Sequence, residues 1–441
     1  MNFKLLLTIL LYITSIFSFE NTVNEDILFN DTSSVIDINK LADTSIRDPS
    51  EKKGTNIGGS IIAASIISAN REFVKKPKLY NTFLNNLLIG SLELDSRLFN
   101  QTKVYGNLEA DLNPSIDSTA KYEVFLRELF FDFNFNKQVY FRVGKQVLEW
   151  GRCYFWNPTD LINIERKTFL EKIGFREGVL GTKFHIPFGI NGNIYGFLDL
   201  QKAMRLDSIA LSLKAEYLIK GSEMALSFWT RRGKPLVFGY DVSTRILGID
   251  VTGELTVANG NIMPKIATND SIIYLEQTQK NLIPKVSIGI RRDFDLMGFH
   301  NAITVELEGF YNGEGYKENV FIDSTKYYSN EFINGSVIQI LFTKSEYLLF
   351  KGLYDANYHS KYYAAIFLGV NRFIVSDLTF NLNGIMNIYQ KCGIISLTLG
   401  YTTIGNVYLG ATLISNIGPD KTEYTFLNQS IGLRLVANVR F

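Results

Sequence analysis

The stretch LGIDVTGELTV, residues 247 to 257, alternates apolar and polar side chains without a break. Its odd-numbered positions hold Leu, Ile, Val, Gly, Leu and Val, and the even-numbered positions between them hold Gly, Asp, Thr, Glu and Thr. Successive side chains of a β-strand point to opposite faces, so a strand here has one apolar and one largely polar face. The pattern therefore predicts a strand that separates an apolar from an aqueous environment.

The same two-residue period continues along most of the chain from Ile57 onward. It returns in ITVELE at 303–308 and in LTFNLN at 378–383, and segments of about ten residues carry it roughly eighteen times. A β-sandwich with so many strands would be expected to divide into domains, and a propeller would repeat a motif in each blade, which this sequence lacks. A single closed antiparallel barrel in the outer membrane satisfies every backbone group and explains the alternation, so we predict an all-β transmembrane barrel.

The connections between these segments give a strand number. With the N-terminal segment in the periplasm, connections alternate between outside loops and inside turns, and a last strand that ends inside requires an even number of strands. Four connections have the short length typical of periplasmic turns: 134–137, 189–192, 220–222 and 294–299. The long polar connections 258–282 and 312–335 then lie outside. We expect about eighteen strands, within about 16 to 20, because segments 236–242 and 336–343 are ambiguous.

The N-terminus has the pattern of an export signal. Lys4, an apolar run and the small Ser18 are typical of a secretory signal peptide at residues 1–18. The run is shorter than the roughly 20 apolar residues that span a bilayer, which argues against a retained anchor. Residues 19–56 are polar and predict a flexible periplasmic segment, followed by a barrel at 57–441.

The C-terminus ends in QSIGLRLVANVRF, an alternating strand whose last residue is Phe441. A strand closed by an aromatic residue resembles the end of bacterial outer-membrane barrels. This resemblance implies that Phe441 belongs to an assembly signal recognised by the barrel-assembly machinery, with outer-membrane lipid as the surrounding partner.

Composition excludes several classes of protein. Lys and Arg number 45 and Asp and Glu 44, a balance that argues against nucleic acid as a partner. The three histidines are too scattered for a metal cluster, and nothing in the sequence indicates a cofactor. Cys153 and Cys392 are far apart in sequence, and whether they pair is left open.

The stretch from Val143 to Gly174 is dense in aromatic and charged residues and forms the third outside connection. Asn157-Pro158 initiates a turn, and Leu161, Ile164, Phe169 and Ile173 have the spacing of a short amphipathic helix. In trimeric porins the third external loop folds into the lumen, so by analogy loop 148–176 is expected to narrow a pore. The residues expected to form this constriction are Trp150, Arg152, Trp156, Asn157, Asp160, Glu165 and Arg166.

A family resemblance rests on the block LRELFFDFNFNKQVYFRVGKQVLEWGRCYFWNPTDLIN, residues 126 to 163. The Arg127-Glu128 pair, Asp132, the RVGKQ run, Trp150-Gly151 and the NPTD turn resemble a signature of porin-like outer-membrane barrels related in pattern to alginate-export-type channels. The resemblance covers under a tenth of the chain and implies an outer-membrane channel without specifying its substrate.

The polar faces of the strands predict the charges of the lumen. The residues expected to line the pore are Glu128, Asp132, Arg142, Asp250, Glu254, Arg291, Glu306 and Glu308. This set leans acidic, whereas an exporter of anionic polysaccharide needs a cationic lumen. The balance therefore favours neutral or cationic small solutes.

An enzyme is disfavoured by the sequence. His185, His300 and His359 have no nearby serine motif, as a serine hydrolase would need. We therefore expect a porin-like channel for passive diffusion of small hydrophilic solutes, and no catalysis. Export of a polymer and a plugged structural or adhesin barrel are the alternatives, and a homo-oligomer is left open.

Overall fold

The computed structural model describes residues 54–70, 82–98, 102–113, 121–163, 178–203, 205–277, 279–296, 299–333, 335–402, 406–427 and 429–441. The predicted signal peptide at 1–18 and residues 19–53 lie outside these ranges. No helix within the described residues is long and apolar enough to cross a membrane.

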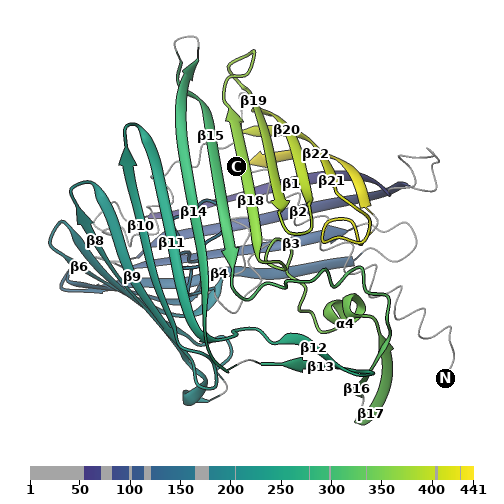
Figure 1. The fold of residues 1–441 in the computed structure, drawn as a ribbon. Coiled ribbons are helices and arrows are strands. Elements are labelled where there is room, and N and C mark those ends of the chain that lie inside the picture. The colour runs from purple at the N-terminus through teal and green to yellow at the C-terminus, as the bar shows by residue number, and fades with distance from the viewer. Residues whose placement is uncertain are drawn as a thin grey trace.

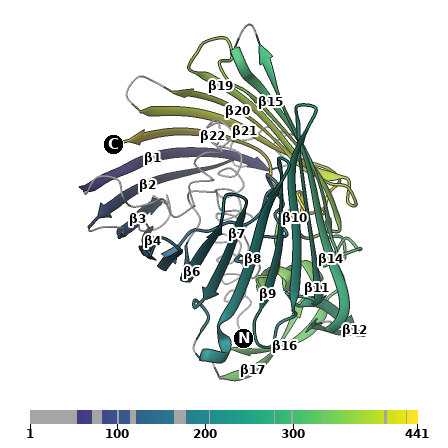
Figure 2. The same cartoon turned by 90° about the vertical axis from the view of Figure 1, so that its left-hand side faces the viewer.

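Eighteen antiparallel strands form one closed barrel (Figures 1 and 2). They are β1 (Gly54–Asn70), β2 (Thr82–Arg97), β3 (Lys103–Asn113), β4 (Lys121–Phe135), β5 (Val139–Gln146), β6 (Val179–Phe188), β7 (Gly192–Asp199), β8 (Ala210–Ile219), β9 (Ser222–Thr230), β10 (Val237–Ile246), β11 (Ile249–Gly260), β14 (Gln279–Leu296), β15 (Phe299–Asn312), β18 (Tyr362–Val370), β19 (Leu378–Asn387), β20 (Cys392–Thr402), β21 (Val407–Ile417) and β22 (Gln429–Arg440). The prediction of an all-β barrel with about eighteen strands is confirmed.

The barrel closes where the first strand meets the last. β1 pairs antiparallel with β22 from Ser60 opposite Arg440 to Asn70 opposite Gln429. Beyond the ladder, Phe441 and Gly59 exchange two backbone hydrogen bonds of 2.9 and 3.0 Å. Closure leaves no barrel strand with an unpaired edge, which is the condition for a β-structure in lipid.

Short turns gather at the end of the barrel that contains Phe441. Lys220 and Gly221 connect β8 to β9, and Leu247 and Gly248 connect β10 to β11. All four have positive φ, between 48° and 84°, as the two-residue turns that match the twist of a hairpin require. The connections after β5, β11 and β15 are long and lie at the opposite end, as the sequence predicted for the outside.

A second sheet is built from two of these long connections. It contains β12 (Lys265–Asn269), β13 (Ile272–Glu276), β16 (Tyr327–Ile333) and β17 (Ser336–Phe342), and lies near the helix α4 (Lys344–Phe350) outside the barrel (Figure 1). A short 3-10 helix, η4 (Leu206–Ser208), lies in another connection. Of the two ambiguous segments, 236–242 belongs to barrel strand β10, whereas 336–343 belongs to this external sheet.

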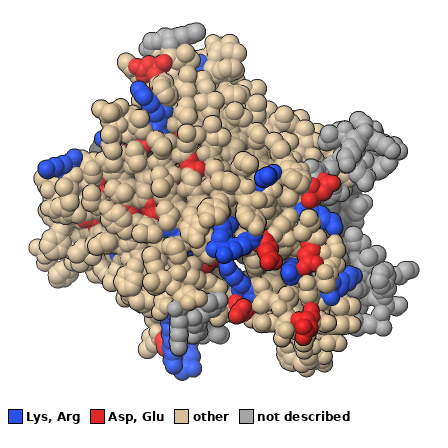
Figure 3. All heavy atoms as spheres, in the orientation of Figure 1, with Lys and Arg blue, Asp and Glu red and all other residues tan. Residues whose placement is uncertain are grey.

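The barrel has an apolar outside and a polar inside. On β15, Leu307 is 47% exposed while its neighbours Glu306 and Glu308 are buried, and Leu255 and Glu254 on β11 differ in the same way. Uncharged residues cover most of the face in Figure 3, and charged side chains gather toward the lower right, where the external segments lie. An apolar belt around a polar interior is the arrangement that a lipid environment requires.

Candidate functional site: a loop bound to the inner wall

The connection after β5 turns into the barrel and contacts its inner wall. Its described part, residues 147–163, has no regular secondary structure beyond turns. Gly144, two residues before the end of β5, has φ +130°, and a Cβ there would collide with the Leu129 carbonyl. The strand therefore needs glycine at this point of close approach to β4, just before the loop begins.

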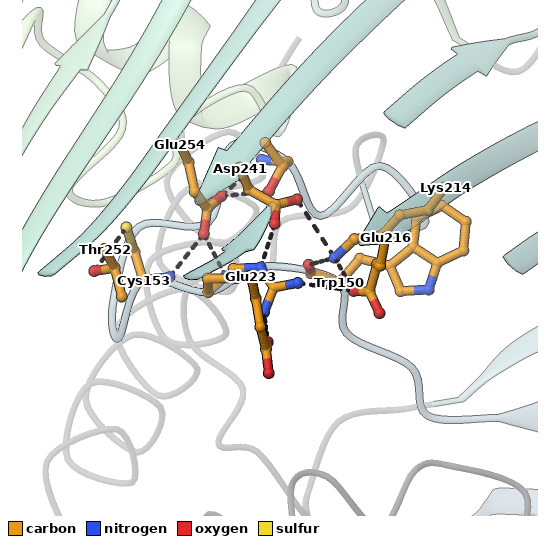
Figure 4. Close-up of polar contacts among 10 residues, drawn as sticks. Trp150, Cys153, Lys214, Glu216, Glu223, Asp241, Thr252 and Glu254 are labelled. Carbon is orange, nitrogen blue, oxygen red and sulfur yellow. Dashed lines mark hydrogen bonds and ion pairs between the residues drawn. The ribbon is translucent and has the colours of Figure 1, made fainter. Parts of the chain in front are cut away.

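The side-chain carboxylate of Glu254 on β11 accepts hydrogen bonds from backbone N–H groups of the loop. One carboxylate oxygen accepts hydrogen bonds from the N–H groups of Arg152 and Cys153, the latter at 2.7 Å. The other accepts the N–H of Thr159 at 2.9 Å and its hydroxyl at 2.6 Å. Glu254 is almost fully buried, so the loop supplies the donors that a buried carboxylate needs. Figure 4 shows Glu254 facing the loop beside Cys153.

Glu308 on β15 provides a second anchor of the same kind. Its two carboxylate oxygens accept the N–H groups of Phe155 and Trp156 at 2.9 and 2.6 Å. The Trp156 side chain has no exposed surface and stacks on Phe310 with ring centroids 5.4 Å apart. Its indole N–H donates to the Asn357 carbonyl at 3.1 Å. Trp156 thereby joins the loop to the inner wall and to the connection after β15.

Arg152 and Lys214 bind a cluster of carboxylates on β8, β9 and β10, the strands that precede β11 and its Glu254 anchor. Figure 4 labels Lys214 and the carboxylates Glu216, Glu223 and Asp241. The Arg152 guanidinium contacts Asp241, Glu223 and Glu216, the last at 3.1 Å. Lys214 lies 3.0 Å from Glu216 and 3.4 Å from Asp241, and donates to the Trp150 carbonyl at 2.7 Å. Together with Glu254 the cluster has four carboxylates and two cations, so its net charge is negative.

The other residues predicted to line the pore also lie on the inner face of the strands. Asp132 and Arg142 form a two-bond ion pair at 2.7 and 2.9 Å. Asp250 pairs with Arg245 at 2.7 Å, and Arg291 pairs with Asp293 at 3.4 Å. Glu128 accepts a hydrogen bond from the Val147 N–H at 2.7 Å, and Glu306 is buried. Most of these charges pair within the wall, which the sequence pattern did not indicate.

The other predicted loop residues stabilise the turn itself. Asp160 accepts the Trp150 N–H at 3.3 Å and the Asn163 amide at 2.7 Å, and the Asn157 amide donates to Glu149 at 3.2 Å. Glu165, Arg166 and the predicted helix beyond Asn163 lie outside the described residues. The predicted role of the loop as a constriction stays a prediction.

A cavity of about 150 Å³ lies between the loop and the external connections. Its lining includes Phe155, Lys265, Glu314, Tyr316 and His359. Burial, and then the charge of Lys265, lower the pKa of His359 to about 3, so this imidazole is neutral. The cavity therefore presents aromatic surface beside an ammonium and a carboxylate at the external end of the barrel.

The histidines and cysteines do not assemble a reactive centre. His185 contacts Asn193 on the inner wall at 2.9 Å, His300 contacts Asp295 near the β14–β15 turn at 2.9 Å, and His359 lies in the connection after β15. Cys153 and Cys392 are both buried and unpaired, and burial raises the pKa of the Cys153 thiol. The described residues contain no group of three His, Cys, Asp or Glu able to hold a metal ion.

Sequence reasoning missed a second buried carboxylate network among the external connections. Glu423 accepts hydrogen bonds from the Asn357 N–H at 2.6 Å, the Tyr363 hydroxyl at 2.8 Å and the Asn387 amide. Burial raises its pKa to about 7 despite these bonds. The only sequence signal is one glutamate in the polar stretch PDKTEYTF, which gave no indication of burial.

The closed barrel, its apolar belt and the inward loop define a transmembrane β-barrel of porin-type architecture. No protein-family model and no curated protein matches the sequence. Among known structures, the BenF-like porin from Pseudomonas fluorescens Pf-5 is similar, with a TM-score of 0.51 and 11% identity over 88% of this chain and 98% of that chain. Pseudomonas aeruginosa OccK8 (OprE) has a TM-score of 0.52 and 8% identity, with the same coverage of both chains. At such identities the likeness establishes the fold.

Proposed function

We propose that this protein is a bacterial outer-membrane channel for passive diffusion of small hydrophilic solutes, with the loop 148–176 as the element that shapes its pore. The observation that carries the proposal is the attachment of the loop to the inner wall through Glu254 and Glu308. A segment held inside a barrel at two points occupies part of its cross-section, and therefore limits the size of what can pass.

The charges of the inner wall support a preference among solutes. The cluster around Arg152 has a net negative charge, and fixed charge of one sign in a narrow passage raises the local concentration of the opposite ion. We infer that neutral and cationic solutes pass more readily than anions. Phe441 belongs to the predicted signal for the barrel-assembly machinery, and the relation of residues 126–163 to alginate-export-type channels stays a prediction.

Planar-bilayer recordings of the refolded protein test the proposal. Stable ohmic openings are expected, with a reversal potential in a salt gradient that indicates cation preference. Release of small neutral sugars from liposomes, together with retention of larger ones, would give the size limit. A correctly folded barrel that shows neither conductance nor solute release would refute the proposal and favour a plugged structural barrel. Preferential passage of an acidic polysaccharide would favour export.

A further inference from the structure

The external sheet has one covered and one uncovered face. On the covered face, Ile273 of β13 and Phe342 of β17 are buried together with Tyr347 of α4. The ladder pairs Phe332 with Val337 on the opposite face, and these two side chains are 75% and 70% exposed. Other exposed apolar residues of the same face are Ile272, Tyr274, Tyr328 and Leu341. The Asn330–Gln339 pair lies between them on this face. An exposed face with this many apolar side chains typically marks an interaction surface.

The edge of the same sheet is also uncovered. β17 pairs with β16 on one side, and no other described strand pairs with it. A strand with one neighbour directs alternate N–H and C=O groups to its free side. Proteins normally protect such edges with charged residues or proline, but the β17 sequence SVIQILF contains neither. β17 is therefore an unprotected template for another strand.

We propose that two copies of this chain associate through β17, paired antiparallel about Gln339. In this register Val337 lies opposite Leu341 of the second copy on the uncovered face, and Ile338 lies opposite Ile340 of the second copy on the covered face. The β17 sequence is apolar one and two residues on either side of Gln339, and Ser336 lies opposite Phe342 at its ends. A two-fold contact therefore matches apolar side chains on both faces over its central five residues.

This symmetry favours a second copy over an unrelated partner. An unrelated strand would need its own complementary sequence, whereas the β17 sequence is complementary to itself. In a membrane every copy also presents the external sheet on the same side, as a contact between two external sheets requires. The pairing would join two four-stranded sheets into one and extend the apolar face across both copies. This proposal does not depend on the proposed channel function.

Disulfide cross-linking of Gln339→Cys tests the register in the full-length protein. Residues directly opposite in an antiparallel pair have Cα atoms about 4.5–5.5 Å apart, within the range that a disulfide bridges. Cys153 and Cys392 are 6% and 2% exposed and so do not compete. Leu206→Cys, at an 89% exposed position of another external connection, is the matched control. We expect mild oxidation to give a covalent dimer with Gln339→Cys and none with Leu206→Cys; equal yields from both, or none from either, would overturn the proposal.

A second variant tests the association without a cross-link. Val337→Lys places a charge on the exposed face of the edge strand, at a side chain that is 70% exposed. Light scattering in detergent should show the mass of a dimer for the wild type and of a monomer for Val337→Lys. Heat-modifiable gel mobility checks that both barrels are folded. A wild-type monomer, or a dimer that persists in Val337→Lys, would overturn the proposal.

Discussion

Replacement of Glu254 by glutamine should loosen the loop by weakening one of its two carboxylate anchors on the inner wall, while the Glu308 anchor remains. The amide keeps one acceptor oxygen, so two of the four hydrogen bonds from the loop are lost and an NH₂ group faces two donors. A hydrogen bond to a charged group contributes about 1.5–3 kcal/mol, so the loss is about 3–6 kcal/mol. At about 1.4 kcal/mol per factor of ten, the released population should rise by about 10²–10⁴.

The Cys153 thiol gives a direct readout of this release. It is buried beside the Glu254 anchor and its pKa is raised by burial, so it reacts slowly with maleimide while the loop is bound. In a Cys392→Ser background, Glu254→Gln should accelerate labelling of Cys153 by about 100-fold or more. Single-channel recordings should show more frequent excursions to a larger conductance, because the loop narrows the lumen less while it is detached from residue 254.

Glu306→Gln is the matched control for charge. Glu306 also faces the interior and is buried, but it makes no hydrogen bond to the described part of the loop. Its neutralisation removes one luminal carboxylate and leaves the anchors intact, so labelling and conductance should stay near wild-type values. If Glu254→Gln leaves both at the level of this control, the wall carboxylate does not hold the loop, and the reasoning is refuted.

Three further predictions concern the fold around the site. Gly144→Ala should prevent or strongly reduce barrel assembly, measured by heat-modifiable mobility, because a Cβ at φ +130° meets the Leu129 carbonyl. Gly106→Ala is the control: its added Cβ would lie 3.6 Å from the nearest atom, so this variant should assemble normally. Trp156→Ala should lower the free energy of unfolding in urea by about 3–5 kcal/mol, and a loss below about 1 kcal/mol would show that the stacked indole is not an anchor. The pKa of Glu423 in the folded protein, about 7, lies above the ordinary value of 4.5. The contribution of this group to stability is therefore complete below about pH 4.5 and is lost as the pH rises through 7. Hydrogen exchange of residues 419–427, corrected for intrinsic rates, should accelerate over this range in the wild type and not in Glu423→Gln.

The sequence predicted the barrel because the two-residue period directly reflects the two environments of a strand. The same period was ambiguous at 336–343, where β17 alternates between a face packed near α4 and an exposed apolar face. Alternation of apolar and polar residues shows that the two faces of a strand differ, but it does not show whether the apolar face contacts lipid. That segment therefore resembled a barrel strand although it lies in the external sheet.

The attachment of the loop could not be predicted in the same way. Glu254 is 101 residues from Cys153 and Glu308 is 152 residues from Trp156 along the chain, and the sequence pattern gives only the face on which each carboxylate lies. Which inward carboxylates receive the loop depends on the diameter of the closed barrel and the path of the chain after β5. The stretch WGRCYFWNPTD was predicted to pack in the lumen, but apart from the Thr159 hydroxyl its donors to Glu254 and Glu308 are main-chain N–H groups that no residue type reveals.

This use of main-chain donors affects how the protein can change. Glu254 and Glu308 bind N–H groups that almost any amino acid provides, so most substitutions at Arg152, Cys153 or Phe155 preserve these hydrogen bonds. Trp156 and Arg152 also hold the loop through their side chains, but the side chains of Cys153 and Phe155 can diversify without loss of its attachment to the barrel. A library randomised at these positions should yield many folded proteins with different permeation properties, and would make this barrel a tractable scaffold for directed evolution.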